Sequence, residues 1–179
     1  MTLDVVDAIK GRRSIRSFDS SRDVSDEVIE KLIEAATWAP SAGNIQPWEF
    51  IIVRNSEAKR RLAEAAFGQS FLAEAPVVVV VCADENRSGA RYDERGRALY
   101  CLQDTAAAVQ NIHLSAYAMG LGTCWIGAFN EEKAASVVEV SDGVRPVAMI
   151  PVGYALKPAS IPGRRPVNQV VHREVFRVR

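Results

Sequence analysis

The chain has few of the residues that build metal centres and disulfide frameworks. Its 179 residues include three cysteines, Cys82, Cys101 and Cys124, and only two histidines, His113 and His172. The cysteines are odd in number, widely spaced and form no CxxC motif, so a disulfide framework and a zinc site are both poor interpretations. Such cysteines are typical of buried thiols in a reducing compartment. We therefore expect a cytoplasmic protein without a metal site.

Net charge and long apolar runs are lacking as well. Lys plus Arg and Asp plus Glu number 22 each, so nothing in the overall balance calls for nucleic acid or a membrane surface as a partner. The longest apolar run, residues 75–83, is too short to span a bilayer. Residues 1–10 resemble an amphipathic helix with acids rather than a signal peptide. With 48% hydrophobic residues, the chain is expected to form one domain over residues 1–179.

The common nucleotide-binding motifs are missing too. No GxGxxG follows an early strand, so a Rossmann site is unsupported. No Lys-Ser or Lys-Thr and no immediate helix follow Gly127, so residues 120–127 are not a phosphate loop. Instead, Gly122-Thr-Cys-Trp-Ile-Gly127 predicts a strand that ends in glycine, where a ligand can approach the backbone closely.

Apolar periodicity and turn residues predict an α+β fold with a mixed central sheet between helices. The expected helices cover residues 1–10, 25–39, 56–67, 99–119 and 131–139, and the expected strands cover residues 49–54, 76–83, 123–126 and 147–154. Residues 84–97, rich in arginine and glycine, are expected to form a mobile loop. Pro151 implies that the last strand lies at an edge or carries a bulge there.

The helix expected over residues 99–119 carries two informative faces. His113 shares its apolar face with Val109 and Ala116, which favours a core histidine over a ligand. A second face holds only small or polar side chains, which allow close helix approach: Asp104, Ala107, Ala108, Asn111 and Ser115. We hypothesise that this second face packs against another helix, across a dimer.

The C-terminal segment, residues 155–179, has three prolines and little to bury, and a structureless segment of this length is unusual in a compact domain. Strand alternation returns at residues 171–179. We interpret the segment as an arm that adds a strand elsewhere, to a partner subunit.

The loop Pro-Ser-Ala-Gly-Asn-Ile-Gln-Pro-Trp at residues 40–48 is more polar than a plain connection requires. Ser41, Asn44 and Gln46 can each donate and accept hydrogen bonds, and Trp48 adds an aromatic face. Such a loop suits a flat heterocycle with donors and acceptors along one edge. A stiff surface loop is the alternative interpretation.

A basic segment, Arg12-Arg13-Ser14-Ile15-Arg16-Ser17-Phe18, follows the first expected helix. Guanidinium forks and hydroxyls suit a phosphate monoester because bidentate charge-assisted bonds hold it in place. A solvated basic run is the alternative, although the interleaved Ile15 and Phe18 favour a segment packed against the body. A second pair, Arg164-Arg165, is either a solvated charge pair or the other half of a phosphate clamp.

These segments, in this order, resemble the FMN-dependent nitroreductase family. The likeness rests on Arg-Arg-Ser-x-Arg, Pro-Ser-x-x-Asn-x-Gln-Pro-Trp and Gly-Leu-Gly-x-x-Trp-Ile-Gly, and it extends over essentially the whole chain. Residues 95–111 also resemble the family's central helix. By this resemblance, Arg12, Arg13 and Ser14 would hold the FMN phosphate, joined by Arg164 and Arg165.

The resemblance also implies roles around the flavin ring. Arg16 would lie near its pyrimidine edge, while Ser41 and Asn44, supported by Gln46, would approach from the opposite subunit of a homodimer. Three backbone positions would flank the reactive edge of the ring: Trp125, Ile126 and Gly127. The C-terminal arm would be exchanged between subunits.

The expected activity is transfer of hydride from NADH or NADPH through FMN to a nitroaromatic, quinone or similar small-molecule acceptor. The chain lacks a dedicated dinucleotide fold, so the two substrates would use the same face of the flavin in turn, and we expect ping-pong kinetics. A backbone donor at Ile126 or Gly127 could bond the reactive nitrogen. The alternatives are dehalogenation, flavin fragmentation or dehydrogenation on the same scaffold, a non-catalytic flavin-binding protein, and a cofactor-free domain.

Overall fold

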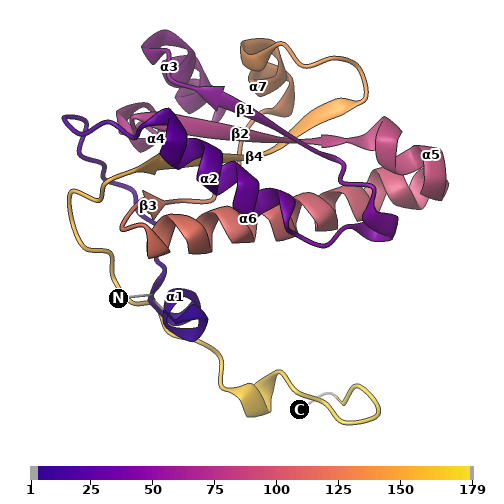
Figure 1. Cartoon of the computed structure of the whole chain (residues 1–179). Helices are drawn as coiled ribbons and strands as arrows, with labels where there is room; N and C mark the ends of the chain where they lie inside the picture. Colours follow the sequence, from indigo (N-terminus) through magenta and orange to yellow (C-terminus); the bar gives the residue numbers. More distant parts are fainter. Residues whose placement is uncertain (1–3, 178–179) are drawn as a thin grey trace.

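The computed structural model describes residues 4–177 and has a sheet between two layers of helices (Figure 1). The elements in chain order are α1 (Val5–Gly11), α2 (Asp26–Thr37), η1 (Ala42–Asn44), β1 (Trp48–Val53), α3 (Ser56–Ala65), α4 (Phe71–Glu74), β2 (Val77–Asp84), α5 (Glu85–Arg95), η2 (Gly96–Tyr100), α6 (Cys101–Ala118), β3 (Gly122–Thr123), α7 (Glu131–Val138), β4 (Val144–Gly153) and η3 (Val167–Gln169). The predicted α+β class, with helices on both faces of a central sheet, is confirmed.

The sheet has the strand order β1-β2-β4-β3, and each of its ladders is antiparallel. Within residues 4–177 its parallel component is the single bridge between Ser14 and Thr123. The five consecutive valines of β2 are fully buried on both faces of the sheet. Because side chains alternate along a strand, Val77 and Val79 pack toward α2 and α6, whereas Val78 and Val80 pack toward α3, α4 and α7.

β4 is an interior strand, paired with β2 on one side and with β3 on the other. The prediction that Pro151 marks an edge or a bulge is therefore wrong. Pro151 lies in register opposite Val78, and the irregularity between these strands falls between Val81 and Cys82 instead.

Pro151 does, however, explain why β3 is so short. Continuing the register of β3 and β4 places Cys124 opposite Pro151, which has no N–H to donate to the neighbouring strand. Pairing resumes two residues later, where Ile126 and Met149 exchange two backbone hydrogen bonds of 3.0 Å. The strand expected over residues 123–126 is thus split into β3 and an isolated bridge.

The expectation of a mobile loop over residues 84–97 is wrong, because these residues form α5 and the start of η2, a π-helical turn. The Asp84 carboxylate accepts a hydrogen bond of 2.8 Å from the Arg87 backbone N–H and so caps α5. Gly96 permits the close return of the chain, since a Cβ there would lie 2.4 Å from the Ser88 carbonyl oxygen.

The small-residue face of α6 packs against α2 of the same chain. Ala108 belongs to the core between these helices and the sheet, and Asn111 donates a 3.0 Å hydrogen bond from Nδ2 to the Ala35 carbonyl of α2. The prediction that this face meets another helix is confirmed, whereas its role across a dimer stays a prediction. His113 is 2% exposed, which confirms it as a core residue.

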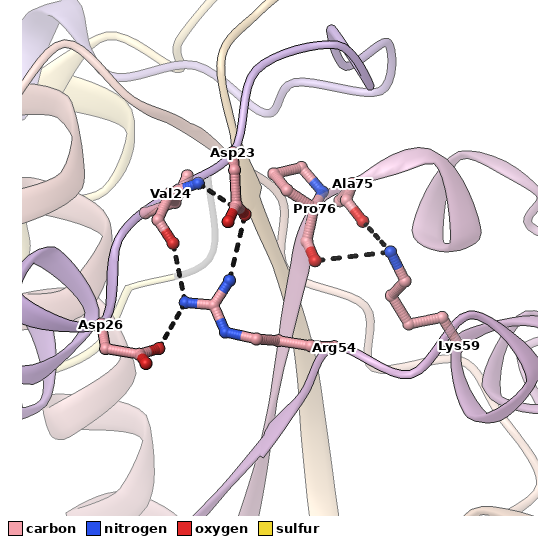
Figure 2. A network of polar contacts seen from close by, with 7 residues as sticks. All are labelled: Asp23, Val24, Asp26, Arg54, Lys59, Ala75 and Pro76. Atoms are coloured by element: carbon pink, nitrogen blue, oxygen red, sulfur yellow. Dashed lines mark hydrogen bonds and ion pairs between the residues drawn. The ribbon is translucent and has the colours of Figure 1, made fainter.

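A polar network ties the edge of the sheet to the helices around it (Figure 2). The Arg54 guanidinium at the end of β1 donates to Asp23 at 3.1 Å, and to Asp26 and the Val24 carbonyl at 2.7 Å each, before and at the start of α2. Lys59 of α3 is 8% exposed, and its Nζ donates to the Ala75 carbonyl at 2.6 Å. This amine satisfies a carbonyl in the turn between α4 and β2.

Beyond Leu156, which donates to the Ser17 carbonyl, residues up to 177 run in an extended path that includes the turn η3 (Figure 1). Residues 171–177 form no strand, so the strand predicted there is absent from the described part of the segment, and Val178 and Arg179 lie outside it. Exchange of this arm between subunits stays a prediction.

Candidate functional site

The basic segment at residues 12–16 lies beside β3, so two of the segments singled out in the sequence are adjacent. Ile15 donates a backbone hydrogen bond of 2.9 Å to Thr123, and Ser14 forms a parallel bridge with the same residue. The chain beyond β3 leads directly to Trp125 and Gly127. The structure therefore assembles the arginines and the glycine-ended strand along one edge of the sheet.

Two glycines allow this close approach. A Cβ on Gly11, the last residue of α1, would lie 2.2 Å from the Tyr117 hydroxyl of α6. A Cβ on Gly122 would lie 2.7 Å from Cγ1 of Ile15. Larger residues at either position would move the basic segment away from α6 and β3.

A cavity of about 500 Å³ opens between this segment, the end of α6 and the start of the C-terminal arm. Its lining comprises Gly11, Arg12, Arg13, Ile15, Tyr117, Gly120, Leu121, Gly122, Thr123, Ala155, Pro158, Ala159 and Ile161. The volume is within the range of small-molecule sites. Arg12 and Arg13 thus border a space that could receive an anionic ligand.

Arg13 has a second task. Its Nη1 donates to the Lys10 carbonyl at 2.6 Å and to the Arg12 carbonyl at 2.8 Å, which satisfies the end of α1. Its Nε is buried and has no hydrogen-bond partner among the described residues. The Nε N–H of Arg13 is therefore left without a partner among the described residues, while Nη1 holds the end of the helix.

Buried polar groups support β3 from below. His113 Nδ1 and Thr123 Oγ1 lie 2.6 Å apart, and each residue is 2% exposed. Burial, with a smaller contribution from the nearby Arg12 charge, lowers the pKa of His113 to about 4. A neutral His113 therefore anchors the residue on which the basic segment is aligned.

Ser14 and Arg16 both lie close to the thiol of Cys124, the residue that follows β3. Burial raises the pKa of the Cys124 thiol, while the Arg16 charge and the Ser14 hydroxyl oppose that rise. Ser14 is half-buried and Arg16 is exposed. Both predicted ligand-binding residues thus lie at the edge of β3 that also bears Arg12.

Of the two backbone donors considered beside the ring, only one is available. The Ile126 N–H donates to the Met149 carbonyl at 3.0 Å, whereas the Gly127 N–H makes no hydrogen bond within residues 4–177. Trp125 between them and β3 is 40% exposed. Gly127 therefore has a backbone N–H that a ligand beside it can accept.

The polar loop at residues 40–48 is held in a fixed conformation. Ser41 Oγ accepts from the Gln46 N–H at 3.0 Å, and the Gln46 amide donates to the Asn44 side chain at 3.2 Å. Gly43, Asn44 and Gln46 all have positive φ, of 55°, 57° and 55°. A positive φ costs free energy in non-glycine residues such as Asn44 and Gln46, and such strained positions are typical of functional loops.

Asp104 and the arginines of α5 hold this loop, and the sequence interpretation did not assign them that task. Asp104 Oδ1 accepts from the Ala42 N–H at 3.1 Å, Arg87 Nε donates to the Ile45 carbonyl at 2.6 Å, and Arg91 Nη1 donates to the Gly43 carbonyl at 3.3 Å. The signals for them were an acid within an apolar helix, and arginines at helical spacing.

Within one chain, the polar loop and the basic segment lie at opposite ends of α6. The loop contacts Asp104 near the start of the helix, whereas Gly11 contacts Tyr117 near its end. These two helix positions are roughly 20 Å apart at 1.5 Å per residue. In Figure 1, α5 and β3 lie toward opposite ends of α6. One chain therefore does not bring Ser41 and the arginines together.

The second arginine pair is also apart from the first. Arg164 donates to the Pro162 and Gly163 carbonyls at 3.3 and 3.1 Å, and Arg165 donates to the Gln169 carbonyl at 3.0 Å. Both side chains are exposed, although the arm that bears them begins along the cavity at Ala155.

Two kinds of feature are absent from residues 4–177. No group of three or more His, Cys, Asp or Glu side chains is arranged to hold a metal ion. No helix in this range is both long enough and apolar enough to cross a membrane.

Comparison with known proteins relates this α+β fold and its motifs to one family. The Nitroreductase family model matches residues 9–70 and 66–154. The Thermus thermophilus protein named NADH dehydrogenase is 32% identical over 196 residues, which cover 94% of this chain and 95% of that protein. The Bacillus subtilis protein named FMN reductase (NADPH) is 31% identical over 186 aligned residues, which cover 96% of this chain and 73% of that protein.

Solved structures agree with these relatives. The NfrA1 nitroreductase of Bacillus subtilis superposes with a TM-score of 0.88 at 28% identity, over 98% of this chain and 76% of that one. NfrA2 of Bacillus megaterium gives a TM-score of 0.89 at 28% identity, over 97% of this chain and 75% of that one. The chain belongs to the nitroreductase family, as its sequence motifs predicted.

Proposed function

We propose that this protein is an FMN-dependent oxidoreductase that takes hydride from NADH or NADPH and reduces a nitroaromatic, quinone or similar acceptor. The observation that carries the proposal is the alignment of residues 12–16 on β3 beside the cavity. Relatives named FMN reductase and NADH dehydrogenase support an NAD(P)H-dependent flavin oxidoreductase. When bound, FMN supplies the ability to accept a hydride and to pass electrons on.

The donors present along the cavity fit a flavin phosphate. Arg12 and Arg13 border the space, Arg13 keeps an unpartnered buried Nε, and Ser14 lies beside them. Charge-assisted guanidinium bonds are the interactions that hold a phosphate firmly. Arg164 and Arg165 would reach the phosphate only if the arm turned back, because here both donate to carbonyls of the arm.

The ring would lie further along the same edge. Arg16 is exposed next to Cys124 and would place its charge near the pyrimidine edge of the ring. Gly127 would offer its unpaired backbone N–H, with Trp125 and Ile126 fixing the course of the chain there.

A second copy of the chain would complete the site. Ser41, Asn44 and Gln46 lie at the far end of α6 from the arginines of their own chain, as described above, so in a homodimer they would contact the flavin bound to the partner. The exposed C-terminal segment would cross to the partner as an exchanged arm. Light scattering that gave a monomer at micromolar concentration would contradict this arrangement.

Kinetics give a second test. If NAD(P)H and the acceptor use the same face of the flavin in turn, double-reciprocal plots of rate against NAD(P)H at several acceptor concentrations should be parallel. Intersecting lines would require the two substrates to bind together.

The phosphate clamp is tested by the pair of substitutions Arg12→Ala and Arg16→Ala, made separately. A hydrogen bond to a charged group contributes about 1.5–3 kcal/mol, so FMN should bind each variant at least about tenfold more weakly. Arg61→Ala, at an exposed arginine of α3 on the other face of the sheet, is the matched control and should bind FMN like the unmodified chain. Unchanged affinity in the first two variants would remove these residues from the site.

A further inference from the structure

Four arginines in α5 and η2 make no ion pair with any described residue, although the chain holds equal numbers of acids and bases. Each donates to a neutral acceptor instead: Arg87 to the Ile45 carbonyl, Arg91 to the Gly43 carbonyl, Arg95 to the Tyr100 hydroxyl and Arg97 to the Asn86 side chain. Neutral acceptors hold a guanidinium in place but leave its charge uncompensated. The four guanidiniums of this segment are therefore held by neutral groups and engaged in no ion pair among the described residues.

The neighbouring acids do not form ion pairs with these arginines among residues 4–177. Asp93 and Glu94 lie on the same helix but form no ion pair among residues 4–177, and Glu85 is engaged by Arg145 at 3.1 Å. Asp93 also has a φ of 47°, which breaks the helix between Arg91 and Arg95. The two guanidiniums are thus exposed on either side of a bend, without a carboxylate at hydrogen-bond distance.

Two tyrosines lie between these arginines. Tyr92 and Tyr100 pack edge to face with ring centroids 5.2 Å apart. The guanidinium carbon of Arg91 lies 5.5 Å from the Tyr92 centroid, and that of Arg95 lies 5.3 Å from the Tyr100 centroid. The two guanidiniums and the two rings therefore form one cluster, in which the arginines offer N–H donors to an anionic group and the rings offer apolar contact to a flat ligand.

This cluster adjoins the polar loop. A Cβ on Gly43 would lie 2.6 Å from the Tyr92 hydroxyl and 3.0 Å from the Arg91 guanidinium carbon. Glycine at this position, with a φ of 55°, lets the loop and α5 meet without a gap. A ligand that touched the loop at Gly43 would therefore lie beside Arg91 and Tyr92.

We infer that Arg91 and Arg95, with Tyr92 and Tyr100, form a binding site for the anionic group of a flat aromatic substrate. The inference rests on the proposed function, since it assigns these residues to the substrate that meets the flavin. The group bound at this site would be a phosphate or a carboxylate attached near an aromatic ring. Its source is either the 2′-phosphate of NADPH or a carboxylate on the electron acceptor.

Calorimetric titration of the full chain tests the site by binding alone, so it does not depend on turnover. Adenosine 2′-monophosphate is compared with adenosine, and 4-nitrobenzoate with 4-nitrobenzyl alcohol. Arg95→Gln should weaken binding of the anionic member of at least one pair by about tenfold or more and leave its neutral counterpart within twofold. Arg95→Lys should restore part of that affinity, because it keeps the charge and loses the bidentate fork.

The two pairs distinguish the sources. A loss confined to the adenosine pair assigns the site to NADPH, and a loss confined to the nitrobenzoate pair assigns it to the acceptor. Arg61→Gln on α3 is the control and should bind all four probes like the unmodified chain. Equal effects on anionic and neutral probes, or no effect on any of them, would overturn the site. A thermal melt verifies that each variant is folded. Failure of the chain to bind FMN would refute the proposed function separately, because these titrations need no flavin.

Discussion

Replacing Thr123 with Val should destabilise the protein through a single buried hydrogen bond. The change keeps the shape of the side chain but removes the hydroxyl that lies 2.6 Å from His113 Nδ1. Both residues are 2% exposed, so water cannot take its place. The ring nitrogen would be buried without a partner.

The magnitude follows from that unpaired group. Leaving a buried polar atom unsatisfied costs about 1–3 kcal/mol, against a total stability of about 5–15 kcal/mol for a domain. Thr105→Val is the matched control, because Thr105 is equally buried but its hydroxyl bonds only to carbonyls of its own helix, from Cys101 and Leu102. Those carbonyls also accept hydrogen bonds within the helix, so Thr105→Val should lower the free energy of unfolding by less than Thr123→Val does.

Urea unfolding followed by circular dichroism measures both variants, and a double-mutant cycle with His113→Leu isolates the pair. The double variant should be no less stable than Thr123→Val alone, since neither polar partner is then left over. A Thr123→Val variant as stable as the unmodified chain would refute the reasoning. Additive losses in the double variant would show that the two side chains do not act as a pair.

Two further predictions concern buried bases. Because the folded-state pKa of His113 lies near 4 while the unfolded value is near 6.5, the unfolded chain binds more protons between these values, and stability should fall by up to about 3 kcal/mol as the pH is lowered through this window. Urea titrations from pH 7 to pH 4 check this, and His113→Leu should flatten the profile. Lys59→Met should cost about 1.5–3 kcal/mol, because the Ala75 carbonyl loses a charged donor at 2.6 Å. The same change at the exposed Lys31 is the control, and equal losses at both positions would refute the assignment.

Local signals in the sequence gave the bounds of α2, α3, α6 and α7 to within two residues. The helix expected over residues 131–139 is α7, and the Asn130 side chain caps it by accepting from the Lys133 N–H at 2.8 Å. The helix at residues 84–97 was missed because arginine and glycine were read as loop residues. Its signals were the Asp84 cap and the four-residue spacing of Arg87 and Arg91, which are as local as those of Asn130.

Non-local pairing limited the prediction of the sheet and of the site. The place of β4 in the sheet depends on which strands lie beside it, and a proline in one strand carries no information on whether its neighbour needs a donor at that point. Likewise, the basic residues at 12–16 were identified as a group, but their alignment on Thr123 is a contact between distant segments. The separation of Ser41 from Arg12 along α6 required the structure.

The central claim is tested most directly by the visible spectrum of the purified protein, recorded without oxygen before and after addition of NADH, and then of NADPH. The protein should show a flavin spectrum that bleaches with at least one of the two nucleotides. A flavin spectrum that persists with both would contradict the reductase activity and favour a flavin-binding protein. A colourless protein that takes up no added FMN would contradict the assignment of Arg12, Arg16 and the cavity beside β3 to a flavin.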